Sequence, residues 1–207
     1  MAKGMLDSRW IAYVGPFRFP QGEAGSRRVY GIARSLQEAG HPVMVGSGES
    51  EPPTPVLMHS GEQAGLSYLG LAEMPRRTSS IFAKALRWYI TLGRRTVRWL
   101  DRQPTLPSGV IIYGDYAPYV LRLQAWCRRR HVPLICDVVE WYNSSHVQGG
   151  PLGPSNVSAK TTLRLLYPRS DGIIAISSFL EDYYRRRGCR VLRVPPTLDV
   201  EHTVSNI

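Results

Sequence analysis

Carboxylate and aromatic side chains follow an apolar segment in the second half of the chain. Glu140 comes directly after residues 133–139, which read as a strand, and is followed by Trp141 and Tyr142. A carboxylate accepts hydrogen bonds from hydroxyl groups, and an aromatic ring offers a flat apolar surface to a ligand. These residue types suit a sugar, with Trp141 against the sugar face and Glu140 or Asp137 accepting from hydroxyls. The alternative for Glu140 is a surface ion pair with an arginine.

A second acidic and aromatic pair occupies the equivalent place after another strand-like segment. Asp115 and Tyr116 follow residues 110–113. Because parallel strands end at a common edge where ligands bind, we expect this pair and Glu140 at the same edge. Glu140 and Asp115 are the candidate catalytic residues, which would orient an acceptor hydroxyl, and Tyr116 is a candidate substrate-binding residue. Since aspartate is also an ordinary turn residue, a structural role for Asp115 stays open.

A glycine-containing loop near the amino terminus could bind an anion. Gly22 and Gly25 permit a close backbone approach, and Ser26 and Arg27 follow them at the predicted start of a helix. Exposed amides at a helix start attract negative charge, so a diphosphate or a phosphorylated acceptor could bind against Ser26 and Arg27. The alternative is a tight structural turn with solvated arginines. The glycine spacing does not form the G-x-G-x-x-G fingerprint of dinucleotide-binding proteins.

Apolar strand-like segments alternate with helical patterns along the whole chain. This alternation predicts an α/β fold with an open parallel sheet and helices on both faces, which is a Rossmann-like arrangement. Ser177 follows a strand at the same edge and is a candidate ligand contact, although capping of the next helix also explains its hydroxyl. The predicted strands are 10–14, 41–46, 68–71, 110–113, 133–139, 172–176 and 191–194, and the predicted helices are 26–40, 78–102, 119–130, 158–167 and 177–188.

The composition indicates one globular domain over residues 1–207. A hydrophobic fraction of 43% supplies enough apolar surface for a core. The longest apolar runs are far shorter than the ~20 residues that a membrane-spanning helix needs, and residues 1–8 lack the apolar stretch of a secretory signal. Cys127, Cys136 and Cys189 have neither disulfide-framework nor zinc-site spacing, and we expect core roles and a cytoplasmic location.

Positive charge concentrates on one predicted helix. The net charge is +10, and all but three of the basic residues are arginine. On a helical projection of residues 80–102, the basic side chains gather on one face and Trp88 and Trp99 lie at its border. We interpret Arg94, Arg95 and Arg98, with these tryptophans, as a surface that could contact an anionic membrane. The alternative is an ordinary amphipathic helix whose apolar face covers the sheet and whose arginines face solvent.

Four segments, in order, resemble the amino-terminal domain of a retaining family 4 glycosyltransferase of the GT-B type. They are the glycine loop and helix that end in Gly40-His-Pro-Val43, the segment Cys136–Tyr142, the segment Ser170–Glu181 and the segment Val191–Asp199. The resemblance implies an acceptor-binding half, a nucleotide sugar as donor and a sugar or lipid-linked acceptor. It also implies a donor-binding domain with a Glu-x7-Glu motif, which this sequence lacks.

The resemblance therefore predicts that the chain alone is inactive and that a missing domain or a partner polypeptide binds the donor. No cofactor or metal is expected on this chain. A nucleotide-dependent epimerase or dehydrogenase would share the parallel sheet but needs the glycine fingerprint. A basic nucleic-acid-binding module is a further alternative, yet the sequence has no RNA-recognition signature or zinc-finger spacing.

Overall fold

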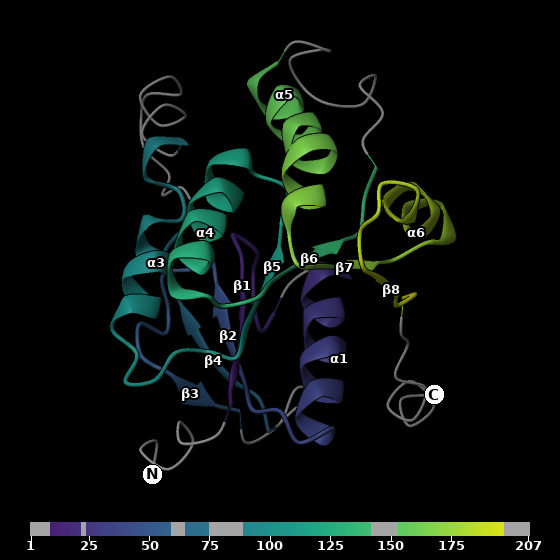
Figure 1. Ribbon diagram of the computed structural model, residues 1–207. Coiled ribbons are helices and arrows are strands. Elements are labelled where there is room, and N and C mark those ends of the chain that lie inside the picture. Colours follow the sequence, from purple (N-terminus) through teal and green to yellow (C-terminus); the bar gives the residue numbers. More distant parts are fainter. Residues whose placement is uncertain (1–8, 22–23, 59–64, 75–88, 142–152, 197–207) are drawn as a thin grey trace.

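A computed structural model describes residues 9–21, 24–58, 65–74, 89–141 and 153–196. They form an eight-stranded sheet in the order β3-β4-β2-β1-β5-β6-β7-β8 (Figure 1), and every neighbouring pair is parallel except β3 and β4. The predicted open parallel sheet is thus confirmed. The strands are β1 (Ile11–Val14), β2 (Val43–Ser47), β3 (Val56–Leu57), β4 (Ser67–Gly70), β5 (Gly109–Tyr113), β6 (Leu134–Val138), β7 (Gly172–Ala175) and β8 (Val191–Arg193).

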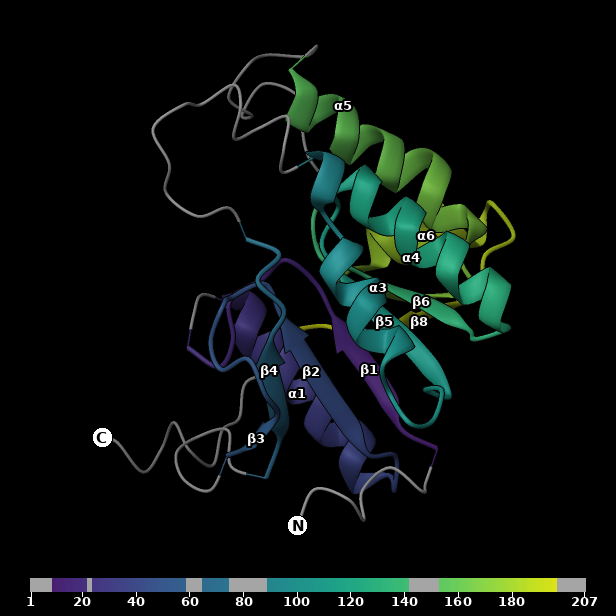
Figure 2. The same cartoon turned by 90° about the vertical axis from the view of Figure 1, so that its left-hand side faces the viewer.

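Helices lie on both faces of the sheet, but unequally. Figures 1 and 2 show α1 on one side, and α3, α4, α5 and α6 on the other. A π-helical turn (Thr162–Leu166) and a 3-10 turn (Tyr167–Arg169) extend α5 toward β7. The helices are α1 (Ala24–Glu38), α3 (Arg94–Asp101), α4 (Ala117–Arg130), α5 (Pro154–Thr161) and α6 (Ser178–Arg185).

Alternation along the strands creates a core on each face. In β1, Ala12 and Val14 belong to a core that includes Leu123 of α4, whereas Tyr13 between them belongs to a core with Val29 of α1. Successive side chains of a strand point to opposite faces, so one strand contributes to both cores. Cys127 and Cys136 are buried in the first core, as the sequence suggested.

The arginine-rich segment is not one continuous helix. Gly93 has a left-handed backbone with φ 84°, and α3 begins at Arg94 after it, so the predicted helix over 78–102 is wrong at this point. The carboxylate of Glu73, which follows β4, accepts hydrogen bonds at 2.8 Å from the Gly93 and Thr96 amides and at 2.9 Å from the Thr96 hydroxyl. A carboxylate at a helix start satisfies amides that have no partner within the helix. Residues 78–88 lie outside the described residues.

Two further elements differ from the sequence-based prediction. Ser26 was expected to begin the first helix, but α1 begins at Ala24, and Ser26 is buried in its first turn. The short antiparallel strand β3 follows a segment that we predicted as a surface loop. Both residues of β3 are exposed, so this strand has no buried face. It therefore lacks the alternating apolar pattern from which a strand is predicted.

Candidate functional site

The carboxyl ends of the central strands lie at one edge of the sheet, and the surface there has two hollows. The larger hollow has a volume of about 910 Å³ and adjoins a smaller one of about 300 Å³. Both are lined by Phe17, Tyr113, Val139 and Glu140. We call the two together the edge cleft. Its other lining residues include Arg18, Gly25, Ser26, Arg27 and Arg28 in the larger hollow, and Gly114, Asp115, Tyr116, Asp137 and Tyr167 in the smaller one.

The edge cleft brings together most of the candidate catalytic and substrate-binding residues predicted from the sequence. The start of α1 supplies Gly25, Ser26 and Arg27, and the ends of β5 and β6 supply Asp115 and Glu140. They gather because consecutive parallel strands end at the same edge. The cleft therefore combines helix-start amides and exposed arginines on one side with two carboxyl groups on the other.

Glycines at this edge allow the backbone to approach a tyrosine. A Cβ atom added at Gly25 would lie 2.7 Å from the Tyr113 hydroxyl oxygen, and one added at Gly15 would lie 2.1 Å from the Tyr113 carbonyl oxygen. Gly15 and Gly25 are thus required for the packing of the loop and of α1 against the end of β5. Gly22 lies outside the described residues.

The Asp115 carboxyl group in the smaller hollow has a raised pKa. Asp115 is half-buried, whereas Glu140 is exposed. Burial raises the pKa of Asp115 to about 6. A hydrogen bond from the Asp115 backbone lowers the pKa, and the Glu140 charge raises it further. A carboxyl group with this pKa can accept a proton near neutral pH, which suits a general base.

Asp137, which we expect from the sequence to accept hydrogen bonds from sugar hydroxyls, instead forms a buried ion pair with Arg28. The Arg28 guanidinium donates from Nε at 3.0 Å to both oxygens of Asp137 and from Nη2 at 2.7 Å to Oδ1. The Tyr13 hydroxyl donates to Oδ2 at 2.6 Å, and Arg28 Nη1 donates to the Val194 carbonyl at 2.9 Å. Because both carboxylate oxygens accept from protein donors, Asp137 positions α1 and the chain after β8 rather than offering a free carboxylate to a hydroxyl. A charged residue inside an apolar strand was the available signal, since buried charges are almost always paired.

Trp141 and Ser177 interact with protein groups instead of lining the described part of the cleft. The Trp141 ring meets Tyr183 edge-on at 4.5 Å and Phe179 at 5.5 Å between centroids, and the Arg164 guanidinium lies 5.7 Å from its centroid. The ring is half-buried and packs against the first core. The Ser177 hydroxyl accepts from the Leu180 amide at 3.3 Å, which confirms the capping role.

The basic surface is only partly as the sequence suggested. Arg94, Arg95 and Arg98 are exposed on α3, and Arg95 also donates to the Ala72 carbonyl at 3.0 Å. Trp99 is half-buried and packs edge-on against Trp10 at 5.8 Å, so it belongs to the core boundary. Trp88 lies outside the described residues.

The described part of the chain has neither a membrane-spanning helix nor a cluster of metal-binding side chains. None of its helices combines the length and the apolar character that crossing a membrane requires. Within the same residues, no three His, Cys, Asp or Glu side chains are grouped so that they could hold a metal ion.

A family model described as "Glycosyl transferase 4-like domain" matches residues 24–197. The match covers most of the chain and includes every strand of the sheet except β1, so the chain belongs to this family. A search of curated protein sequences found no match.

Solved structures of GT-B glycosyltransferases share the fold at low sequence identity. LpCGTa in complex with UDP has a TM-score of 0.59 at 12% identity, with 96% of this chain and 57% of that chain covered. Arabidopsis thaliana UGT89C1 with UDP-L-rhamnose has a TM-score of 0.55 at 16% identity, with coverages of 92% and 50%. The chain thus spans about half the length of these structures.

Sucrose-phosphate synthase from Thermosynechococcus elongatus matches in two forms. The enzyme itself has a TM-score of 0.57 at 12% identity, and 96% of this chain and 53% of that chain are covered. A second chain, designated by the residue numbers 27, 220, 406 and 426, has a TM-score of 0.53 at 12% identity, with coverages of 95% and 93%. The second chain is therefore close to this one in extent.

Proposed function

We propose that this chain is the acceptor-binding half of a nucleotide-sugar-dependent, retaining GT-B glycosyltransferase. The observation that carries the proposal is the edge cleft, in which helix-start amides, arginines and two carboxyl groups converge in a member of the glycosyl transferase 4-like family. Solved structures with the same fold contain UDP or UDP-L-rhamnose, which supports a nucleotide sugar as donor. The family also favours a transferase over an epimerase, a dehydrogenase or a nucleic-acid-binding module.

The two sides of the cleft suit different parts of the reaction. Asp115, beside Glu140, would orient an acceptor hydroxyl and accept its proton as the new glycosidic bond forms. The start of α1, with Ser26 and Arg27, would face the diphosphate, whose negative charge grows as its bond to the sugar breaks. The donor-binding half would come from further residues of the same polypeptide or from a partner polypeptide.

The experiment uses the complete protein, or the chain together with its donor-binding partner. Release of nucleoside diphosphate is measured with UDP-glucose, UDP-N-acetylglucosamine and GDP-mannose as probes, with and without glycan or lipid-linked acceptors. Asp115→Asn should lower acceptor-dependent release roughly 100-fold or more, because general-base catalysis contributes about this much. Asp182→Asn, at an exposed residue of α6, is the matched control and should leave release unchanged. Acceptor-dependent release that survives Asp115→Asn would remove Asp115 from the mechanism, and absence of release with every probe would contradict the proposal.

We further propose a cytoplasmic enzyme that contacts an anionic membrane through α3. Three exposed arginines on an eight-residue helix support this, since each basic side chain near a charged bilayer contributes about 1 kcal/mol before salt screening. The protein should float with anionic vesicles and not with neutral phosphatidylcholine vesicles. Arg94→Gln combined with Arg98→Gln should weaken flotation, whereas Arg128→Gln combined with Arg129→Gln at the end of α4 should not. Equal flotation with both vesicle types would contradict membrane contact through charge.

A further inference from the structure

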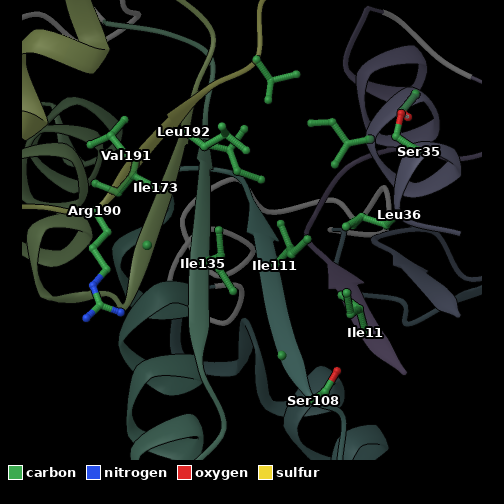
Figure 3. Close-up of a pocket in the computed structure, with 16 residues that line it drawn as sticks. Ile11, Ser35, Leu36, Ser108, Ile111, Ile135, Ile173, Arg190, Val191 and Leu192 are labelled. Atoms are coloured by element: carbon green, nitrogen blue, oxygen red, sulfur yellow. Dashed lines mark hydrogen bonds between the residues drawn. The ribbon is translucent and has the colours of Figure 1, made fainter. Parts of the chain in front are cut away.

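Tyr113 is the last residue of β5, and its side chain lines both hollows of the edge cleft. Figure 3 shows Ile111, two residues earlier on β5, in an apolar groove together with Leu36 of α1. Because alternate residues of a strand point to the same face, Tyr113 also faces α1, and both side chains pack in the core beneath that helix. A Cβ atom added at Gly25 would lie 2.7 Å from the Tyr113 hydroxyl oxygen. The hydroxyl thus lies inside the cleft, against the start of α1.

The ring of Tyr113 has a fixed position in the cleft. Phe17, which is buried, meets it edge-on with 5.6 Å between the ring centroids. On another side, the ring occupies space that Gly25 leaves open because it has no side chain. A hydrogen-bond donor that is already in place does not have to reorganise when charge develops next to it. The packing of Tyr113 therefore suits its hydroxyl to contact a reacting group.

No hydrogen bond joins the Tyr113 hydroxyl to any residue that the structure describes. The buried tyrosines beside it differ in this respect. The Tyr13 hydroxyl donates to Asp137 at 2.6 Å, and the Tyr167 hydroxyl donates to the Gly114 carbonyl at 2.9 Å. Buried tyrosine hydroxyls usually have a partner, so a half-buried hydroxyl in a cleft is suited to donate to a ligand.

The Tyr113 hydroxyl keeps its proton at neutral pH. Burial raises the pKa of Tyr113 to about 12. The charged groups that act on this hydroxyl are Asp137, Glu140 and Asp115, which raise the pKa, and Arg28, which lowers it. These groups come from the ends of β5 and β6 and from α1, which shows that the hydroxyl is central to the cleft.

We propose that the Tyr113 hydroxyl donates a hydrogen bond to the phosphate oxygen that leaves the donor sugar. This inference rests on the proposed function, in which the start of α1 faces the diphosphate and Asp115 accepts the acceptor proton. The start of α1 lines the larger hollow and Asp115 lines the smaller one, and Tyr113 lines both. The sugar carbon under attack, which connects the diphosphate to the acceptor, is therefore placed beside Tyr113.

The hydrogen bond acts on the bond that breaks. As the acceptor oxygen bonds to the sugar carbon, the bond from this carbon to the phosphate oxygen breaks and its electron pair stays on that oxygen. The acceptor proton goes to Asp115, and Tyr113 keeps its own proton. Negative charge grows on the leaving oxygen, so the hydrogen bond from Tyr113 is stronger in the transition state than in the bound substrate.

Tyr113→Phe removes only the hydroxyl and tests the proposal in the complete protein, or in the chain together with its donor-binding partner. The kcat for acceptor-dependent release of nucleoside diphosphate should fall roughly 100-fold, with both KM values within about twofold of the parent. Tyr68→Phe is the matched control, because Tyr68 is also half-buried with an edge-on partner, Phe19 at 5.5 Å, but lines neither hollow. The melting temperature should stay unchanged in both variants. An unchanged kcat, or a raised acceptor KM at unchanged kcat, would overturn the proposal.

A more acidic hydroxyl at the same position supplies a readout that a structural role would not move. Replacement of Tyr113 by 2,3,5-trifluorotyrosine keeps the ring but lets the hydroxyl ionise at much lower pH. An ionised oxygen cannot donate, so kcat should gain a descending limb between about pH 7 and pH 10, and the same replacement of Tyr68 should give none. Turnover by the parent that neither change at Tyr113 affects overturns this inference alone. Absence of turnover by the parent overturns the proposed function, and this inference with it.

Discussion

Two carboxyl groups that follow adjacent strands differ in environment, and the difference suits them to different roles in the proposed reaction. Asp115 lies in the smaller hollow and is half-buried, whereas Glu140 is exposed and lines both hollows. Burial favours the neutral form of a carboxyl group, and a neighbouring negative charge acts in the same direction. Asp115 is therefore the group suited to take up and release a proton near neutral pH, and Glu140 is the neighbouring group whose charge raises the pKa of Asp115.

This difference predicts the pH dependence of transfer. Because the pKa of Asp115 is raised to about 6, the ionised base is present only above that pH, and acceptor-dependent transfer should rise through pH 6. Glu140→Gln removes a charge that raises this pKa, so the rising limb should move to lower pH. Asp182→Asn should leave the limb in place. The measurement is single-turnover transfer between pH 4.5 and 8, and a profile that Glu140→Gln does not move would contradict the coupling.

The raised pKa of Asp115 affects stability in the direction opposite to its effect on transfer, because its contribution to stability falls as pH rises. The folded pKa of Asp115 lies above the usual 3.8, so the folded state holds this proton more tightly than the unfolded state. The contribution of Asp115 to the free energy of unfolding is thus greatest at low pH and declines as pH rises from about 4 to about 6. A group that weakens the fold at neutral pH yet stands at a cleft has the character of a functional residue.

At the scale of elements, the Arg28–Asp137 pair joins α1 to β6 and to the chain after β8. Arg28→Met leaves a buried carboxylate without its charged partner and should lower the free energy of unfolding by about 3–5 kcal/mol. Arg28→Met combined with Asp137→Leu should cost less than the sum of the single changes, because no unpaired charge remains. Arg34→Gln breaks the exposed Arg34–Glu38 pair and is the control, with an expected cost of at most about 1 kcal/mol. Denaturant unfolding measures Arg28→Met, Asp137→Leu, the double variant and Arg34→Gln. Additive costs of the two single changes would show that the pair does not act as a unit.

The start of α3 depends on a residue from another element. Glu73 accepts three hydrogen bonds from Gly93 and Thr96, so Glu73→Ala removes the partners of two buried amides and one hydroxyl. The loss of a capping group costs about 0.5–2 kcal/mol, and we expect the upper end because this site is buried. Glu73→Gln, which keeps one acceptor oxygen, should cost less. Thermal unfolding compares the two, and equal stability of Glu73→Ala and the parent would show that water replaces the carboxylate.

For the whole molecule, the strands of the sheet could be predicted from the sequence better than the helix boundaries and the side-chain contacts. Buried parallel strands are short runs of apolar and β-branched residues, so segments such as 110–113 and 172–176 could be located from sequence. The edge cleft followed from the strand order, because consecutive parallel strands deliver Asp115 and Glu140 to one edge. The break at Gly93 and the partners of Asp137 could not be predicted, since both depend on contacts between residues distant in sequence. Hydrophobic periodicity indicates which face of an element is apolar, but not which residues pack against that face.

The uneven coverage of the sheet predicts an uneven stability across the molecule. Among the strands that the structure describes, β8 pairs only with β7 and has two exposed residues, whereas β5 and β6 are central and mostly buried. Amides of β8 should therefore exchange with solvent through local opening, at rates well above those of β5 and β6, which open only with global unfolding. In the complete protein, contact of β8 with the donor-binding half should slow exchange in β8 and leave the π-helical turn Thr162–Leu166 unchanged. Hydrogen-exchange mass spectrometry of the isolated chain and the complete protein compares them. Equal protection of β8 in both would mean that the last strand gains no cover from the second half.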